Sequence, residues 1–411
     1  MARKLVVCCD GTWNTPRKET NIFRTYDFLR TRLGEPGEVQ RKDGVRTCAG
    51  RARDGSDVLL FYDQGVGTSW YERLAGGAIG IGLSENVRDA YHFLGHAMAP
   101  GSEIYIFGFS RGAYTARSLC GFIKAAGLLR QPSETDVWRA YMAAYVARQR
   151  VIARPKGWSL ERARARVREV AGEVIDKVGG PGVEALPRHD RFTIRFVGVY
   201  DTVGALGVPL PDTAQINEPI VGFHDTTLGD TLEHAVHALA VDERRGPYAP
   251  TLWTEAANQP LGAGQSVLQV WFPGVHSDIG GGYRDKGIGD ITWDFMMRQA
   301  ARRGLVVDPD QTTPPVTLQP LPRQHESFNA TWTALCDRLH VIPEGVRSIG
   351  ATVRGQDGTA LPVAGEVRLH PSLVTRLGQR CTTILDEGKG TQREADYRPV
   401  NVTANTLPGF A

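Results

Sequence analysis

The feature that most constrains the fold is an apolar run of strand length that turns directly into a helical segment. Residues 103–109 are mostly aliphatic and aromatic, residues 108–112 read G-F-S-R-G, and a helix-compatible segment follows over residues 113–126. A serine on such a strand-to-helix turn has its hydroxyl pushed out of the backbone, and only small residues two before and two after it leave room for the turn. Ser110 is therefore the candidate nucleophile. An ordinary connection with Ser110 as a helix N-cap is the alternative.

Four more apolar runs have strand length, and each ends in a turn or loop that carries glycine; they are residues 4–9, 57–63, 191–200 and 266–272. Segments with helical spacing lie between several of them, at residues 21–33 and 84–98. Alternating strands and helices are typical of a parallel sheet whose ligands gather at the carboxyl ends of the strands. The sequence therefore predicts an α/β fold of the α/β-hydrolase type, with a mostly parallel central sheet flanked by helices.

We expect one α/β-hydrolase domain over residues 1–411. Residues 131–190 are rich in Arg, Ala and Glu, and we expect a helical insertion there that serves as a lid or cap. Its Arg-rich faces suit acidic lipid head groups, although a solvated surface gives the same composition. Residues 327–411 are expected to form a C-terminal appendage packed on the core. We expect a polar surface excursion at residues 34–56 and helices at residues 228–241 and 290–303.

Composition excludes several classes of protein. Hydrophobic residues make up 41% of the chain and charged residues 23%, which is typical of a globular protein, and the formal charge of +3 gives no reason to expect a nucleic-acid partner. Six scattered cysteines without C-x-x-C pairs predict neither a disulfide framework nor a zinc site. Without a signal peptide or a transmembrane run, we expect a cytoplasmic protein, with signal-independent secretion left open.

Two further candidate catalytic residues follow predicted strands. Asp201 comes directly after residues 191–200, and His276 follows residues 266–272 in a loop with three consecutive glycines. The chain order Ser110, Asp201, His276 is the order expected for an α/β-hydrolase. The imidazole would move the serine proton, while the carboxylate orients the ring. Asp278 is a rival for the acid, but we expect it to hold its own loop through backbone N–H groups.

The oxyanion hole of such an enzyme uses the N–H after the nucleophile and one from a loop two strands earlier. These criteria assign it to Arg111 and to Gly11 or Thr12. The same loop also suggests a phosphatase that uses an aspartyl nucleophile, but Cys8 stands where that aspartate belongs; Asp10 could equally cap a turn.

Two histidines, His234 and His237, lie three residues apart in the expected helix at residues 228–241. A zinc site would require further ligands, so ordinary hydrogen-bonded histidines are the favoured interpretation.

Several short motifs follow one another along the chain in an order that resembles the α/β-hydrolase family known as domain of unknown function 2235. They are D-G-T-W-N, Y-D-Q-G-V-G-T, G-F-S-R-G-A, Y-D-T-V and G-V-H-S-D-I-G-G-G-Y, with H-P-S and Arg376 near the end. The resemblance implies a serine hydrolase with the triad Ser110, Asp201 and His276. Its characterised branch comprises phospholipase effectors of bacterial type VI secretion systems.

We therefore expect an esterase, lipase or phospholipase that cleaves carboxylic esters through an acyl-enzyme and needs no metal or organic cofactor. An ester or lipid is the expected substrate and a membrane surface the expected partner; the sequence does not predict an oligomeric state. The alternatives are a metal-dependent phosphatase that uses Asp10 and a catalytically idle module that binds lipid or protein.

Overall fold

The computed structural model describes residues 3–11, 14, 16–41, 44–65, 79–147, 182–203, 230–255, 261–328, 344–350, 352–354 and 360–402. Their centre is a nine-stranded sheet whose strands are, in spatial order, β12 (Glu366–Leu369), β8 (Ser266–Phe272), β7 (His234–Ala240), β6 (Thr193–Tyr200), β5 (Glu103–Phe109), β1 (Lys4–Cys9), β4 (Asp57–Asp63), β3 (Arg46–Arg51) and β2 (Gly34–Gln40). Neighbouring strands from β12 to β4 are parallel, whereas β3 pairs antiparallel with both β4 and β2.

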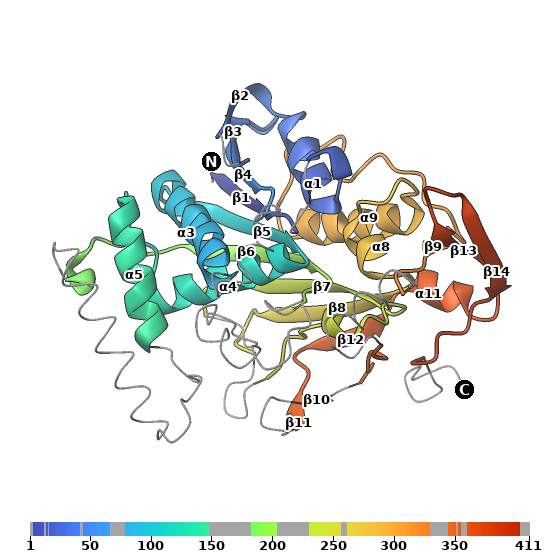
Figure 1. Cartoon of the computed structure of the whole chain (residues 1–411). Helices are drawn as coiled ribbons and strands as arrows, with labels where there is room; N and C mark the ends of the chain where they lie inside the picture. The colour runs from blue at the N-terminus through green and yellow to red at the C-terminus, as the bar shows by residue number, and fades with distance from the viewer. Residues whose placement is uncertain are drawn as a thin grey trace, which may run out of the picture.

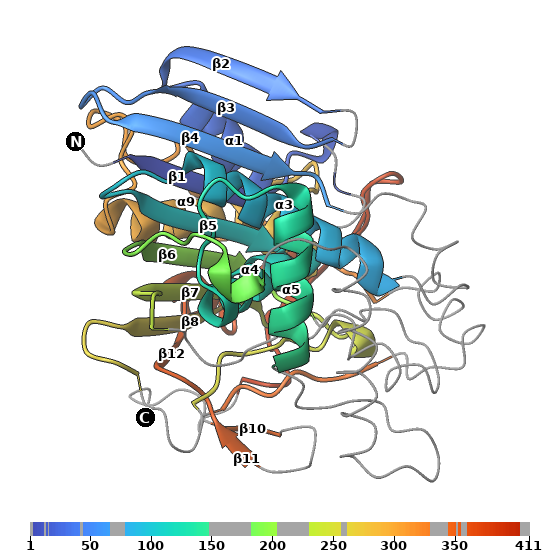
Figure 2. The ribbon, with the colours of Figure 1, turned by 90° about the vertical axis from the view of Figure 1, so that its left-hand side faces the viewer.

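Helices cover both faces of this sheet (Figures 1 and 2). One layer contains α3 (Ile79–Ala97), α4 (Arg111–Ala126) and α5 (Glu134–Ala147); the other contains α1 (Asn21–Arg30) and α9 (Gly287–Arg302). Side chains of β1 alternate between the two cores, because successive strand residues point to opposite faces. Leu5 and Val7 join the core beneath α3 and α4, while Val6 and Cys8 join the core beneath α1 and α9. The predicted α/β fold with a mostly parallel sheet is confirmed.

The expected helix at residues 228–241 is wrong, because the described part of this segment forms β7. Strand β7 lies between β6 and β8, and every residue from Ala235 to Ala240 is buried. Leu232, Val236 and Leu239 are spaced four and three residues apart, which also fits a helix. Burial on both faces of a parallel sheet overrides that local preference. Residues 34–56 likewise form β2 and β3 at the edge of the sheet, where one surface excursion was expected.

The C-terminal part of the chain adds β12 to the central sheet, beside β8. It also forms a small sheet of β9 (Gln324–His325), β13 (Arg380–Asp386) and β14 (Thr391–Asp396), which lies near α11 (Pro371–Arg376) in Figure 1. A separate hairpin pairs β10 (Thr352–Arg354) with β11 (Ala360–Pro362). The remaining described elements are the short helix α8 (His276–Gly280) and three 3-10 helices, η1 (Pro16–Lys18), η2 (Val183–Ala185) and η4 (Gly246–Tyr248).

Within the predicted insertion, α5 is described, while residues 148–181 lie outside the described ranges. None of the helices in the described ranges has the length and apolar character that a bilayer span requires.

Candidate active site

Ser110 occupies the turn between β5 and α4 in a backbone conformation that residues other than glycine rarely adopt. Its φ is 57° and its ψ is −120°, and its N–H donates a 3.0 Å hydrogen bond to the carbonyl of Tyr200 at the end of β6. Such a conformation costs about 1–3 kcal/mol and persists only where the surroundings hold it. The Ser110 side chain makes no capping bond to the described first turn of α4, so the N-cap interpretation is not supported.

The two glycines of the G-F-S-R-G turn are required by close backbone approaches. A Cβ atom on Gly108 would lie 2.5 Å from the carbonyl oxygen of Gly112. A Cβ atom on Gly112 would lie 2.5 Å from the carbonyl oxygen of Asp10 and closer still to that of Cys9. Real Cβ atoms are not found at such distances, so a side chain at Gly108 would push α4 away from the end of β5, and one at Gly112 would push it away from the end of β1. The two glycines therefore seat the N-terminus of α4 on the ends of β5 and β1.

The loop after β1 lies against the serine turn, as the sequence predicts. A Cβ atom on Gly11 would be 3.2 Å from Cβ of Ser110. The N–H of Gly11 donates a 2.7 Å hydrogen bond to Oδ1 of Asp10, so this group is already engaged. Thr12 lies outside the described residues, and Arg111 is the first residue of α4.

Asp10 is a bracing residue of this loop and is only 1% exposed. Besides the Gly11 N–H, its carboxylate accepts hydrogen bonds from Asn14, Thr20 and Tyr62. Burial raises the pKa of Asp10 to about 6 in spite of these donors. All four donors come from the protein itself, which favours the interpretation that Asp10 caps and braces a turn.

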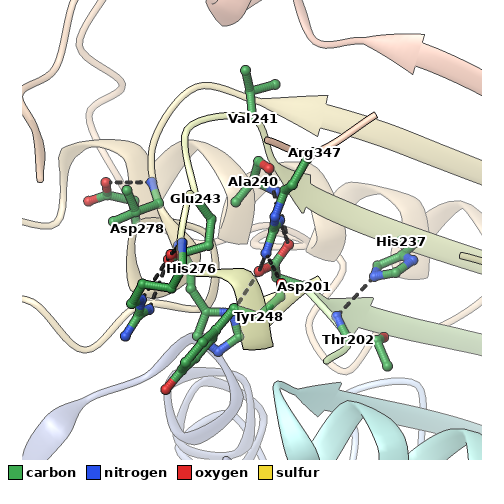
Figure 3. A network of polar contacts seen from close by, with 12 residues as sticks. Asp201, Thr202, His237, Ala240, Val241, Glu243, Tyr248, His276, Asp278 and Arg347 are labelled. Carbon is green, nitrogen blue, oxygen red and sulfur yellow. Dashed lines mark hydrogen bonds and ion pairs between the residues drawn. The ribbon is translucent and has the colours of Figure 1, made fainter. Parts of the chain in front are cut away.

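Asp201 and His276 are brought into direct contact at the carboxyl edge of the sheet (Figure 3). Asp201 follows β6 with a φ of 40°, and His276 opens the short helix α8 (His276–Gly280) after β8, where a loop was expected. Nδ1 of His276 lies 2.6 Å from Oδ2 of Asp201, and both side chains are buried. An ionised carboxylate accepts hydrogen bonds only, so it selects the imidazole tautomer with the proton on Nδ1.

The imidazole of His276 also packs on two aromatic rings. Its ring centroid is 4.7 Å from that of Phe109, the residue before Ser110, and 5.0 Å from that of Tyr248. The Phe109 contact places His276 beside the serine turn. Burial lowers the pKa of His276 below its ordinary value of 6.5, although the hydrogen bond to Asp201 opposes this change. A neutral imidazole is the form that accepts a proton.

Arg347 is a residue of this site that sequence analysis did not identify. Its guanidinium group donates 2.6 Å and 2.9 Å hydrogen bonds to the two carboxylate oxygens of Asp201. Burial opposes ionisation of Asp201, but the charge of Arg347 and the hydrogen bond from His276 outweigh it and hold the pKa of Asp201 well below its ordinary value. No local pattern distinguishes this arginine from the many others in the chain.

A second buried carboxylate, Glu243, holds the backbone of His276. It follows β7 and accepts a 3.1 Å hydrogen bond from the N–H of His276. It also pairs with the guanidinium of Arg245 and accepts from the hydroxyl of Ser327. Burial opposes its ionisation, but Arg245 outweighs burial and lowers the pKa of Glu243 to about 2. Sequence analysis assigned no role to Glu243.

Asp278 is paired with a different histidine. Its carboxylate accepts the N–H of Val275, as expected for a residue that holds its own loop, and it contacts Nδ1 of His325 at 2.6 Å. The ring of His325 stacks on that of Tyr283, and its Nε2 lies 3.4 Å from Oε1 of Glu387. This cluster fastens α8, which carries His276, to the small C-terminal sheet.

His234 and His237 lie on β7 and not on a helix, so residues three apart face opposite sides of the strand. Nδ1 of His234 lies 2.8 Å from the hydroxyl of Ser266. Nε2 of His237 accepts the N–H of Thr202 at 3.0 Å, and burial lowers the pKa of His237 to about 3. Across the described ranges, no three or more His, Cys, Asp or Glu side chains are grouped as metal ligands.

The mostly parallel sheet, the helices on both faces and the serine turn after β5 define an α/β-hydrolase-like protein. Residues 3–299 match the family model described as "T6SS, Phospholipase effector Tle1-like, catalytic domain", and the chain belongs to this family. The family resemblance inferred from the motifs is therefore confirmed. The matched residues end well before Arg347.

Similar proteins include longer chains from a yeast and a bacterium. An uncharacterized protein of Saccharomyces cerevisiae is 26% identical over 257 residues, which cover 61% of this chain and 33% of that protein. A crystal structure of an uncharacterized protein from Pseudomonas aeruginosa has a TM-score of 0.38 at 18% identity and covers 75% of this chain and 48% of that one. The Tle1 effector bound to the VgrG spike of the type 6 secretion system has a TM-score of 0.32 at 19% identity, with coverage of 69% and 52%.

Proposed function

We propose that this protein is a carboxylic ester hydrolase in which Ser110, Asp201 and His276 form a catalytic triad. The observation that carries the proposal is the 2.6 Å contact between Nδ1 of His276 and Oδ2 of Asp201. The His276 ring packs on Phe109, which precedes Ser110 in the strained strand-to-helix turn. With the Nδ1 proton bound by a carboxylate, Nε2 of the imidazole is left as the base. Membership of a phospholipase effector family supports the same class of reaction.

In this mechanism the hydroxyl oxygen of Ser110 attacks the ester carbonyl carbon while His276 takes the hydroxyl proton. The tetrahedral intermediate collapses as His276 returns that proton to the departing alcohol, which leaves an acyl group on Ser110. Water then attacks the acyl carbon, His276 removes a proton from the water, and the acid is released as Ser110 recovers its proton. Asp201 stays ionised throughout and stabilises the imidazolium formed in each half-reaction.

The oxyanion hole consists of the backbone N–H of Arg111 at the start of α4 and one N–H from the loop after β1. Of the two residues predicted for that loop, Thr12 is favoured over Gly11, because the N–H of Gly11 donates to Asp10. The loss of one donor to an oxyanion typically costs about 2.7–4 kcal/mol of transition-state stabilisation.

The proposed substrate is a lipid-like ester, and phospholipids are the class that the family favours. The proposed partner is a membrane surface. Family membership supports this choice, since the family is described by its phospholipase effectors. Residues 1–411 act as one α/β-hydrolase domain, residues 131–190 serve as its lid or cap, and residues 327–411 pack on the core.

The test combines active-site labelling with a substrate panel. Purified protein is incubated with a fluorophosphonate probe, and separately with p-nitrophenyl esters, triglyceride emulsions and phospholipid vesicles. We expect wild-type protein to be labelled and to release fatty acid, and Ser110→Ala to do neither. Ser118→Ala, a buried serine of the same helix α4, is the matched control and should behave as wild type.

Probe labelling that survives Ser110→Ala would overturn the triad. Phosphate-monoester hydrolysis that depends on a divalent cation and ignores the probe would favour the phosphatase alternative. Vesicle binding that is unchanged by Ser110→Ala, without labelling or fatty-acid release, would favour a binding module.

A further inference from the structure

Arg347 reaches the candidate active site from a segment that lies after the family-matched residues 3–299. This segment is fastened beside the end of β7: Glu344 forms a β-bridge with Arg245, and the N–H of Gly345 donates to the carbonyl of Arg244 at 2.7 Å. Asn401 donates to the carbonyl of Arg347 and to that of Val241. The backbone of Arg347 is thus held on both sides.

The guanidinium group of Arg347 makes four hydrogen bonds and is almost completely buried, with 5% of the residue exposed. Two bonds go to the carboxylate of Asp201; the others go to the carbonyl oxygens of Ala240 and Tyr248 at 2.8 Å and 2.6 Å. Figure 3 shows the guanidinium and the imidazole of His276 approaching the same carboxylate. A buried arginine is rare unless it is paired, so this position is built around Asp201.

We propose that Arg347 is a positioning residue of the active site, and that the segment after the family's catalytic domain thereby completes the catalytic machinery. The inference rests on the proposed function. A planar fork bound to both oxygens fixes the plane of a carboxylate, which a single donor cannot do. Oδ2 of Asp201 is therefore held facing Nδ1 of His276.

The charge of Arg347 has a second effect on the pair. With Arg347 present, protonation of His276 gives the three groups a net charge of +1, whereas without it the same proton gives a neutral pair. Arg347 therefore disfavours protonation, and its removal raises the pH at which His276 loses its proton. A like charge nearby disfavours the charged form of a titratable group, and the measured pKa belongs to the coupled pair of His276 and Asp201.

Other ionisable groups face the pair without replacing Arg347. Glu243 and Arg245, from the loop after β7, pair with each other and offset one another's charge. His237 on β7 has its pKa lowered to about 3 by burial and is neutral at working pH. Tyr248 of η4 contributes its ring to His276 and its carbonyl to Arg347. Arg347 is thus the cation in direct contact with Asp201 among the described residues.

The test compares Arg347→Lys, Arg347→Gln and Arg347→Ala with Arg376→Ala in the full chain. Arg376 is a matched control, because it is also buried and bonded to a carbonyl, that of Pro322, but lies outside the catalytic network. For each protein, kcat/KM for p-nitrophenyl butyrate is measured against pH, together with fluorophosphonate labelling of Ser110. Arg347→Ala is assayed again with added guanidinium chloride at concentrations below those that unfold the protein.

We expect Arg347→Gln and Arg347→Ala to lose about 10–100-fold in kcat/KM. Losses of this size are typical when a residue that orients a metal-binding side chain through a hydrogen bond is replaced, and Arg347 orients Asp201 in the same way. Their acid limb should move upward by about one pH unit or more. Arg347→Lys should lose activity without that movement, since it keeps the charge but not the fork. Added guanidinium should restore activity to Arg347→Ala and have no such effect on Arg376→Ala.

An acid limb that stays in place in Arg347→Gln, with no guanidinium rescue, would overturn the inference and leave Arg347 a structural residue. The fluorophosphonate labelling tests the proposed function independently of Arg347, because the proposed function fails only if Ser110 is not the labelled residue.

Discussion

Replacement of Gly112 by alanine tests the geometry that presents Ser110. The added Cβ would lie 2.5 Å from the carbonyl oxygen of Asp10, where ordinary van der Waals contact begins at 3.4 Å, and it would lie closer still to that of Cys9. Both obstacles are backbone atoms at the end of β1 and cannot rotate away. The N-terminus of α4 must therefore move by roughly 1 Å, and Ser110 moves with it.

The expected effect on activity is larger than the effect on stability. A displacement of about 1 Å in a catalytic group can cost about 10²-fold in rate. Overpacking of this kind destabilises by about 1–3 kcal/mol, and the better helix propensity of alanine offsets up to about 1 kcal/mol of that loss. We therefore expect kcat/KM for a short p-nitrophenyl ester to fall about 100-fold and the free energy of unfolding to fall by no more than about 2 kcal/mol.

Gly289→Ala is the matched control, because Gly289 also lies in the first turn of a helix at the core, α9. A Cβ there would be 3.5 Å from the carbonyl oxygen of Asp278 and 3.7 Å from Cα of Gly281, which is ordinary contact. This variant should keep wild-type activity and unfold at the same or a higher urea concentration. If Gly112→Ala stays within about threefold of wild type in kcat/KM, close seating of α4 on β1 does not position the nucleophile.

Two further predictions concern pH. Catalysis requires neutral His276, whose pKa burial holds below 6.5, so kcat/KM should fall on acidification with a midpoint below about pH 6.5; a pH–rate profile with a midpoint above 7 would contradict this. The second prediction concerns His325, whose pKa Asp278 and Glu387 raise above 6.5 although burial lowers it. The ion pairs of His325 therefore stabilise the fold fully below pH 6.5, and this stabilisation is lost as the pH rises through the pKa of the folded protein. His325→Gln should therefore lose more unfolding free energy in urea at about pH 5.5 than at pH 9, and equal losses would refute the role.

Much of the fold could be predicted from local sequence. Apolar runs of strand length gave β1, β4, β5, β6 and β8 close to their observed bounds. The turns after these runs identified the edge of the sheet at which Ser110, Asp201 and His276 lie. Two of these residues have a positive φ, and the sequence around Ser110 carries the glycines that such a turn requires. Periodicity and turn chemistry are local properties, so a single sequence records them.

Four strands of the central sheet, β2, β3, β7 and β12, were not predicted in this way, and the last two show why. β7 carries alanine and histidine at positions that also suit a helix, and its strand conformation is decided by its burial between β6 and β8. β12 has four residues with an alternating pattern of exposure, which is too short a segment to be distinguished from a loop. In both cases backbone pairing with neighbours far along the chain decides the conformation.

The sequence by itself determined the α/β class, the serine turn and the order of the three candidate catalytic residues, because each depends on neighbouring residues. Only the tertiary structure decided how the pair of Asp201 and His276 is supported. Arg347 is 146 residues from Asp201, and Glu243 is 33 from His276. A buried charge is stable only beside its partner, and no property of either residue's own segment reveals which distant residue that partner will be.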